Sequence, residues 1–139
     1  AEELKIKIGT VFPVEEERFM EVRGRNLVTG LPEAIEVSSV EIREAISGSI
    51  QVIVDTVKDA IDEAPPELVA DLIETGICLS GGGSQILGMA DRLNDELNIR
   101  VWVAEDPMTC VARGAGMVLE NSSTIEQFAA SLDRFTPKK

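Results

Sequence analysis

The chain has 139 residues, of which 44% are apolar and 27% charged, the balance of an ordinary soluble globular protein with one buried core. Thirteen basic residues against twenty-five acidic ones give a net charge of −12. Such a surface repels phosphate backbones, so we expect no nucleic-acid partner. The chain contains no histidine, which excludes Ser-His-Asp and Cys-His nucleophiles and any histidine-ligated metal site.

Cysteine usage and hydropathy indicate the compartment. Cys78 and Cys110 sit among apolar neighbours, and we expect two small buried hydrophobes rather than a disulfide. No apolar run approaches the length of a membrane span, and no signal-peptide pattern opens the chain. We therefore expect a cytoplasmic protein. The chain begins in the middle of a pattern, without a helix cap, so we expect it to be part of a longer protein.

The first residues give conflicting signals. Leu4, Ile6 and Ile8 alternate with lysines, which is the period of a strand. Their neighbours are good helix formers, however, so both alternatives stay open at this point. Two alternating runs follow at residues 19–23 and 34–37, separated by a segment rich in turn formers. They predict an antiparallel pair of strands.

A long helix comes next. Ser38 and Glu41 form a capping box, and Pro65 ends the pattern that follows. Pro66 opens a shorter helix at its first position, and we expect Gly76 to close it in the left-handed αL conformation. The long helix, of about six turns, carries one apolar stripe made of Ile42, Ile46, Ile50, Ile53, Val57 and Ile61.

The second half of the chain has a βαβ pattern. Residues 77–79 predict a short buried strand, residues 81–84 a turn, and residues 101–103 a second strand. The helix between the strands is marked by Leu87, Ala90, Leu93 and Leu97. A strand, a crossover helix and a strand make a right-handed unit with parallel strands.

A last helix is predicted from Thr109, its cap, to Leu119. Gly114 and Gly116 lie inside it and lower its stability, which indicates a close approach to the sheet or to a ligand. Residues 120–139 then predict an amphipathic C-terminal helix, with Ile125, Phe128, Leu132 and Phe135 at helical spacing.

The turn Gly81, Gly82 and Gly83 lies at the carboxyl end of a strand, where α/β sheets bind ligands. Glycines let a ligand approach the backbone, and a helix that follows them would offer its N–H groups and dipole to phosphate. The turn is not a Walker loop, and Ile86 replaces the third glycine of the dinucleotide fingerprint. A structural turn and a nucleotide site are equally supported by these residues alone.

Catalytic groups are not evident. Glu105 and Asp106 follow the second strand beside the expected ligand, but a solvated, helix-capping loop explains them better. No second acidic group is placed to hold magnesium or to act as a general base. The sequence therefore predicts no catalytic residue and no metal ligand.

Residues 76–84 (GICLSGGGS) resemble the adenosine motif shared by actin, the heat-shock chaperone ATPases and sugar kinases. Further segments narrow the resemblance to the MreB family of bacterial actin homologues, over residues 1 to about 119. These segments are residues 21–27 (EVRGRNL), 29–32 (TGLP), 65–68 (PPEL) and 105–114 (EDPMTCVARG).

The resemblance implies an α/β fold that is half of an actin-like ATPase. Residues 1–75 would form a smaller α+β outer subdomain, with a helix, a β-hairpin, a long helix and a connecting helix. Residues 76–119 would form a ribonuclease-H-like inner βαβα subdomain that contains the adenosine motif. The resemblance also implies that residues 1–8 form a helix, against their strand-like period.

The same resemblance implies a set of nucleotide-binding residues. Glu2 and Lys5 would face the adenosine, and the glycines would approach the nucleotide. For Gln85, Ile86 and Met108 the match is by position only. In this family both phosphate loops, the magnesium-holding aspartate and the membrane-contacting elements lie in the N-terminal half, so Mg²⁺ would be held mainly there. The full set is Glu2, Lys5, Gly81, Gly82, Gly83, Ser84, Gln85, Ile86 and Met108.

As for function, the resemblance implies a cytoskeletal ATPase that binds ATP or ADP and forms filaments under the cytoplasmic membrane. Its partners would be other subunits, the N-terminal half of the same protein and the cell-wall synthesis machinery that gives rod shape. Three alternatives stay open: another actin-superfamily ATPase (a segregation or division actin, or a chaperone), a stand-alone nucleotide-binding α/β enzyme, and an interaction module whose glycines only turn the chain.

Overall fold

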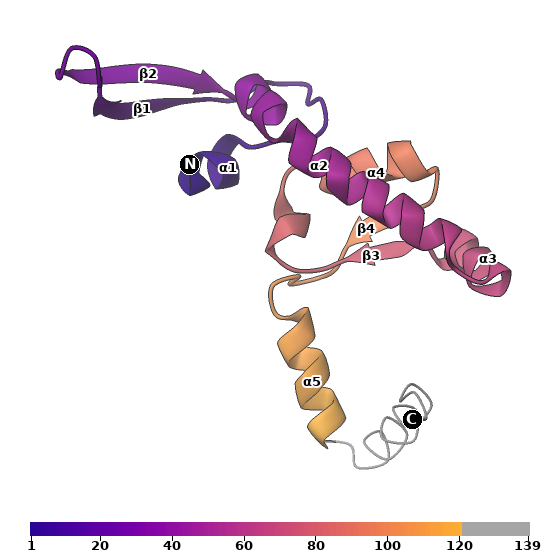
Figure 1. The fold of residues 1–139 in the computed structure, drawn as a ribbon. Helices are drawn as coiled ribbons and strands as arrows, with labels where there is room; N and C mark the ends of the chain where they lie inside the picture. The colour runs from indigo at the N-terminus through magenta and orange to yellow at the C-terminus, as the bar shows by residue number, and fades with distance from the viewer. Residues whose placement is uncertain (121–139) are drawn as a thin grey trace, which may run out of the picture.

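The computed structural model describes residues 1–120, and the predicted helix of the C-terminal tail lies outside them. The chain is α/β, with two separate two-stranded sheets arranged around one long helix (Figure 1). The elements in order are α1 (Glu2–Ile8), β1 (Phe19–Arg25), β2 (Pro32–Ser38), α2 (Ser39–Asp62), α3 (Pro66–Thr75), β3 (Ile77–Leu79), the 3₁₀ helix η1 (Gly82–Gln85), α4 (Met89–Leu97), β4 (Val101–Val103) and α5 (Cys110–Glu120).

The N-terminal segment is a helix, as the resemblance implied, and the strand indicated by its alternating residues is wrong. Glutamates open α1 and lysines close it, which favours the helix dipole. Lys5 pairs with Glu2 at 2.8 Å and Lys7 with Glu3 at 2.6 Å, the i,i+3 and i,i+4 spacings that support a helix. Only Ile8 of α1 is buried, so the alternation does not mark a sheet face.

The hairpin prediction is confirmed. β1 and β2 are antiparallel, in register from Phe19 opposite Ser38 to Arg25 opposite Pro32. Asn26 shapes the connection: its side-chain oxygen accepts the N–H groups of Val28 and Thr29 at 2.8 and 3.0 Å, an Asx turn. The hairpin extends beyond the N-terminal end of α2 as a separate arm (Figure 1).

Helix α2 begins with the predicted capping box. The Ser38 hydroxyl accepts the Glu41 N–H at 3.2 Å, and the Glu41 carboxylate accepts the Ser38 N–H at 2.8 Å. The apolar stripe is correct except at Ile53, which is 45% exposed. Val54 takes its place and is fully buried, because it lies one i,i+4 step beyond the buried Ile50.

Strands β3 and β4 are parallel, as predicted, with Ile77 opposite Val101. The predicted crossover helix does not include Leu87, because Gly88 has a left-handed φ of 83° and α4 begins only after it. Leu87 instead bridges in parallel to Thr10, and its carbonyl accepts the Val11 N–H at 2.9 Å. The segment after α1 is thereby attached to the connection between η1 and α4.

The core lies where α2 crosses α4 and the β3–β4 sheet (Figure 1). Helices α2 and α4 supply most of it, and the segment after α1 and strand β4 supply the rest. Its buried members are Val11, Ile50, Val54, Met89, Leu93 and Val101.

A polar cluster joins the segment between α1 and β1 to the start of α2. The Arg43 guanidinium donates to the buried Thr10 hydroxyl at 2.9 Å and to the Glu17 carboxylate at 2.7 Å. The buried Ser39 hydroxyl also donates to Glu17. These hydrogen bonds, from Ser39 first and then from Arg43, lower the pKa of Glu17 below its ordinary value of 4.5.

Two predictions about small residues are wrong. Gly76 has φ 80° and ψ −168°, which is not the αL conformation. A side chain there would collide with the Arg100 carbonyl and the Trp102 ring, so Gly76 allows the end of α3 to approach β4.

The expected burial of the two cysteines is also wrong. Cys78 is exposed and Cys110 is half-buried, and both are free thiols.

Helix α5 begins directly after Thr109, as predicted. Within residues 1–120 its glycines do not closely approach the sheet, and the alternative, a close approach to a ligand, stays a prediction. Apart from the chain neighbours and the backbone of α5 itself, no atom of residues 1–120 lies within 4 Å of the positions that Cβ atoms on Gly114 and Gly116 would take. The helix extends away from the other elements (Figure 1) and exposes Val111 and Met117. Among residues 1–120, no element covers its apolar face.

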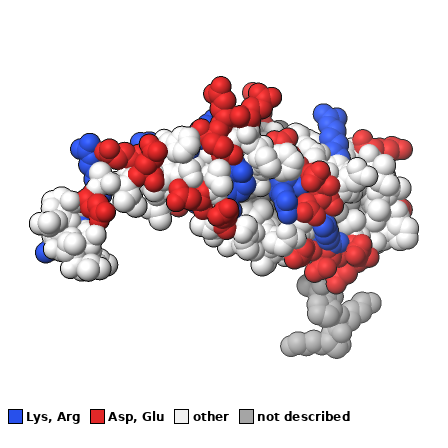
Figure 2. All heavy atoms as spheres, turned by 90° about the horizontal axis from the view of Figure 1, so that it is seen from above, with Lys and Arg blue, Asp and Glu red and all other residues white. Residues whose placement is uncertain are grey.

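On the face drawn in Figure 2 the acidic side chains do not gather in one patch. Figure 2 shows them on several parts of one face, with the basic side chains lying beside them. Within residues 1–120, no helix has the length and apolar character needed to cross a bilayer.

The packing of α2 gives a matched stability test. Val54→Ala removes buried methyl groups and should lower the free energy of unfolding by about 2 kcal/mol. Val52→Ala makes the same change where the side chain is 65% exposed and should stay within about 0.5 kcal/mol of the parent. Urea denaturation of both variants measures the difference, and equal losses would contradict the position of the core.

The cluster around Glu17 predicts a pH-dependent contribution to stability. Because the folded pKa lies below 4.5, the stabilisation is complete above that value and is lost as pH falls through the lower folded pKa. Glu17→Gln should therefore lower the urea midpoint at pH 7, and its deficit should shrink in acid. Glu16→Gln removes the same charge at an exposed neighbouring position and should have little effect. A pH-independent deficit for Glu17→Gln would refute the linkage.

Candidate functional site

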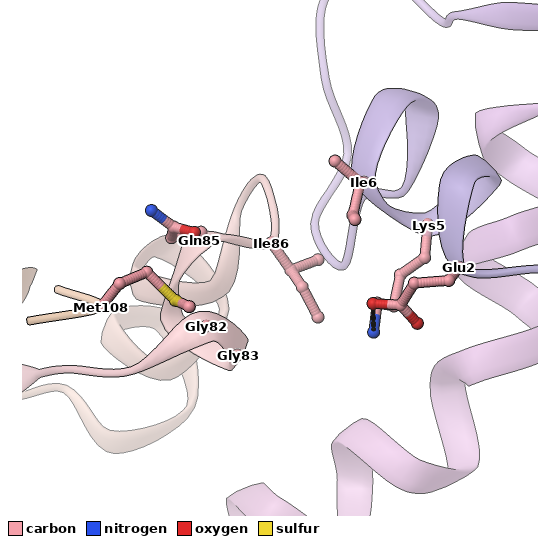
Figure 3. Close-up of a pocket in the computed structure, with 8 residues that line it drawn as sticks. All are labelled: Glu2, Lys5, Ile6, Gly82, Gly83, Gln85, Ile86 and Met108. Atoms are coloured by element: carbon pink, nitrogen blue, oxygen red, sulfur yellow. Dashed lines mark ion pairs between the residues drawn. The ribbon is translucent and has the colours of Figure 1, made fainter.

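A cleft of about 350 Å³ lies between α1 and the glycine turn, within the size range of small-molecule sites (Figure 3). One wall comes from α1, the facing wall from η1 and the residue after it, and the end from the loop between β4 and α5. The lining residues are Glu2, Lys5, Ile6, Gly82, Gly83, Gln85, Ile86 and Met108.

The α1 wall combines charge with an apolar side chain. Glu2, Lys5 and Ile6 share one face of the helix, because they are spaced i, i+3 and i+4. The Glu2 carboxylate and the Lys5 ammonium pair at 2.8 Å beside the cleft (Figure 3). Ile6 was not predicted as a site residue, although the helical period would place it with Glu2 once the strand period is rejected.

The glycine wall is a tight turn that continues into η1. Gly81 has a left-handed φ of 82°, which favours glycine. The buried Ser84 hydroxyl donates to the Gly81 carbonyl at 2.7 Å and holds the turn. A Cβ on Gly82 would lie 3.2 Å from the Met108 sulfur, whereas a Cβ on Gly83 would meet no atom within 4 Å.

The loop that carries Met108 is tied to the same turn. The Gly81 N–H donates to the Pro107 carbonyl at 2.7 Å. Asp106 has a left-handed φ of 50°, and its carboxylate accepts the Thr109 hydroxyl at 2.6 Å. Asp106 does not line the cleft and bonds within its own loop, as the helix-capping interpretation predicted.

Seven of the nine predicted site residues line this one cleft. They come from three separate stretches of the chain, α1, the glycine turn and the loop before α5. The other two, Gly81 and Ser84, lie behind the wall and shape it. The structure therefore separates residues that would touch a ligand from residues that build the turn.

The chemistry of the lining differs from the phosphate site that the glycines suggested. The expected α-helix does not follow the turn directly, since α4 begins at Met89 and contributes no residue to the cleft. The dipole of α4 therefore gives no support for a phosphate in this cleft. Apolar walls from Ile6, Ile86 and Met108, with one carboxylate and one ammonium, suit a flat base and ribose hydroxyls. Among residues 1–120, no group of three acidic or cysteine side chains could hold a metal ion.

Comparison with known proteins places the chain in a family. A family model described as MreB/Mbl protein matches residues 1–127. The cell shape-determining protein Mbl of Bacillus cereus is 48% identical over 121 residues, covering 87% of this chain and 36% of the relative. The cell shape-determining protein MreB of Escherichia coli K12 is 46% identical over 120 residues, covering 86% of this chain and 35% of the relative.

Solved structures give the same result. MreB5 of Spiroplasma citri bound to ADP superposes with a TM-score of 0.82 at 31% identity, over 93% of this chain and 38% of that chain. The same protein bound to AMPPNP gives a TM-score of 0.81 at 31% identity, over 94% and 38%.

The chain thus spans 36% and 35% of the length of these two curated relatives. Its fold is part of the actin-like ATPase fold, which confirms the predicted fold class. The match to the family model covers the hairpin, the long helix and the glycine turn together, so it does not rest on the adenosine motif alone. The chain belongs to the MreB/Mbl family.

Proposed function

We propose that this chain forms the adenosine side of an ATP- and ADP-binding cleft in a filament-forming, actin-like protein. The observation that carries the proposal is the cleft itself, which brings the charged face of α1 against the glycine turn. The solved MreB5 structures of Spiroplasma citri are bound to ADP and AMPPNP, and both share the fold of this chain.

Each lining group has a role that follows from its chemistry. The Glu2 carboxylate accepts hydrogen bonds from ribose hydroxyls, and the Lys5 ammonium holds that carboxylate in place. Gly82 and Gly83 leave room for the nucleoside beside the backbone. The apolar walls contact the faces of the base, and the Gln85 amide offers a donor and an acceptor to its edge.

Hydrolysis needs groups from outside this chain. The phosphates and Mg²⁺ of bound ATP would be held mainly by the N-terminal half of the protein. The residues described above bind and orient the nucleoside only. Labelled ATP supplied to the 139-residue chain alone should therefore show weak binding at best and no turnover.

The wider role follows from the family. The relatives from Bacillus cereus and Escherichia coli are named cell shape-determining proteins. We infer a cytoplasmic protein that polymerises at the inner face of the cytoplasmic membrane and directs cell-wall synthesis to give rod shape. Other subunits and the wall-synthesis machinery would be its partners. The apolar face of α5, which no element of residues 1–120 covers, and the exposed hairpin connection offer surfaces for contact with the rest of the protein or with other subunits.

The alternative of a purely structural glycine turn is less well supported. Gly81 needs its left-handed φ, and a side chain on Gly82 would crowd Met108. Gly83 has neither constraint, since it lacks a positive φ and has open space around its Cβ position. A ligand that occupies this space gives a physical reason for a glycine at position 83.

Gly83→Val tests that reason. The Cβ of the new side chain would meet no protein atom within 4 Å and would take up space proposed for the ligand, so the Kd of the full-length protein for ADP should rise by about tenfold or more. Its melting temperature without nucleotide should stay close to that of the parent. Gly48→Val places the same side chain on an exposed part of α2 and should bind normally. Unchanged affinity of Gly83→Val in isothermal titration calorimetry would favour the structural turn.

The α1 wall offers a second matched pair. Glu2→Gln removes the carboxylate that would accept the ribose hydroxyls, and the Kd for ADP should rise by about threefold to tenfold. Glu3→Gln breaks the comparable Glu3–Lys7 pair, which lies outside the cleft, and should leave the Kd unchanged. Both exposed pairs contribute little to stability. If the two variants had equal Kd values for ADP, Glu2 would not be a nucleotide-binding residue.

A further inference from the structure

Met108 is the exposed, chemically reactive part of the cleft wall. Its side chain is 63% exposed, and it lies beside Gly82 at the end of the cleft (Figure 3). Its sulfur lies 3.2 Å from the position that a Cβ on Gly82 would take. The thioether therefore covers the bare backbone of the glycine turn and presents an apolar surface to the cleft.

Hydrogen bonds on both sides of Met108 hold its backbone beside the glycine turn. The hydrogen bond from the Gly81 N–H to the Pro107 carbonyl, at 2.7 Å, ties the residue before Met108 to the glycine turn. On the other side, the Thr109 hydroxyl donates to the Asp106 carboxylate at 2.6 Å. The loop backbone is thus held beside the glycine turn, and the thioether extends from it along the wall of the cleft.

The three other methionines have different surroundings. Met89 is buried in the core at 5% exposure, and Met20 is half-buried in β1. Met117 is as open as Met108, at 69% exposure, but it lies on α5 and does not line the cleft. Met108 alone among the four combines exposure with a position in the cleft wall.

We propose that Met108 is an oxidation site through which peroxides weaken nucleotide binding, an inference that rests on the proposed function of the cleft. In the reaction, the sulfur attacks the terminal oxygen of a hydroperoxide, the O–O bond breaks and an S–O bond forms. The thioether is oxidised by two electrons to the sulfoxide, and the peroxide is reduced to water or an alcohol. The product replaces an apolar wall by a bulkier, polar group that faces the base.

The experiment uses the full-length protein, freed of nucleotide and treated with hydrogen peroxide. Dithiothreitol is then added to reverse oxidation of Cys78 and Cys110 without reducing sulfoxides. Mass spectrometry of peptides measures the sulfoxide at each methionine, and isothermal titration calorimetry measures the Kd for ADP. We expect the Kd to rise by roughly threefold to tenfold as Met108 is oxidised, the effect of removing one apolar contact.

Two variants separate Met108 from other sites. In Met108→Leu the ratio of Kd after peroxide to Kd before should be close to one, whatever the starting affinity. Met117→Leu should respond to peroxide as the parent does. Methionine sulfoxide reductases should restore binding in the parent, and ADP present during treatment should protect Met108 but not Met117.

Three results would overturn the inference. These are full oxidation of Met108 without a change in Kd, an equal loss of affinity in Met108→Leu, and equal protection of Met108 and Met117 by ADP. Failure of the untreated protein to bind ADP would instead overturn the proposed function, and this inference with it. Binding before treatment therefore distinguishes the two failures.

Discussion

The cleft depends on one short segment, Thr10 and Val11, which links the α1 wall to the wall formed by the glycine turn. The Val11 N–H donates to the Leu87 carbonyl, and Thr10 bridges to the same residue. Both residues are buried. Because this segment follows α1 and Leu87 follows the glycine turn, their attachment contributes directly to the separation of the two walls. Without it, α1 would keep its contacts with α2 and β1, but the charged face of α1 would no longer be held opposite the glycines.

Two further features protect that attachment. Gly88, with its left-handed φ, lets Phe12 pass closely, since a Cβ there would lie 2.7 Å from the Phe12 Cβ. Arg43 reaches from α2 to the Thr10 hydroxyl, so the first turns of the long helix are also bonded to the segment. The core beneath α2 then holds the same helix against α4. Hydrophobic packing and hydrogen bonding thus both stabilise the segment that connects α1 to the rest of the fold.

The sequence predicts the features that local chemistry decides. The capping box at Ser38, the proline that opens α3 and the alternation of the hairpin strands each depend on residues a few positions apart. The seven-residue helix α1 is too short for its period to be distinguished from that of a strand, and the family resemblance was needed. In the apolar stripe of α2, Ile53 was predicted where the structure buries Val54. Both residues are apolar, and only the packing of the folded chain decides which of them is buried.

Features that depend on distant residues could not be predicted. The conformation of Gly76 is set by Arg100 and Trp102 across the sheet, and that of Leu87 by its pairing with Thr10. At the site, the family motif indicated the glycines, but only the structure shows that Ser84 faces inward and that Ile6 joins the cleft. The exposure of Cys78 and of α5 depends likewise on how distant parts of the chain pack, which the neighbouring residues in the sequence do not determine.

The central claim is that a nucleoside lies between α1 and the glycine turn. Photolabelling tests it most directly: full-length protein is irradiated with 2-azido-ATP, whose reactive group is on the base, and the modified peptides are identified by mass spectrometry. The account predicts labels on residues 82–86, on α1 or on Met108, and their loss in the presence of excess ADP. Labels confined to other parts of the protein, or labels that ADP does not displace, would contradict it.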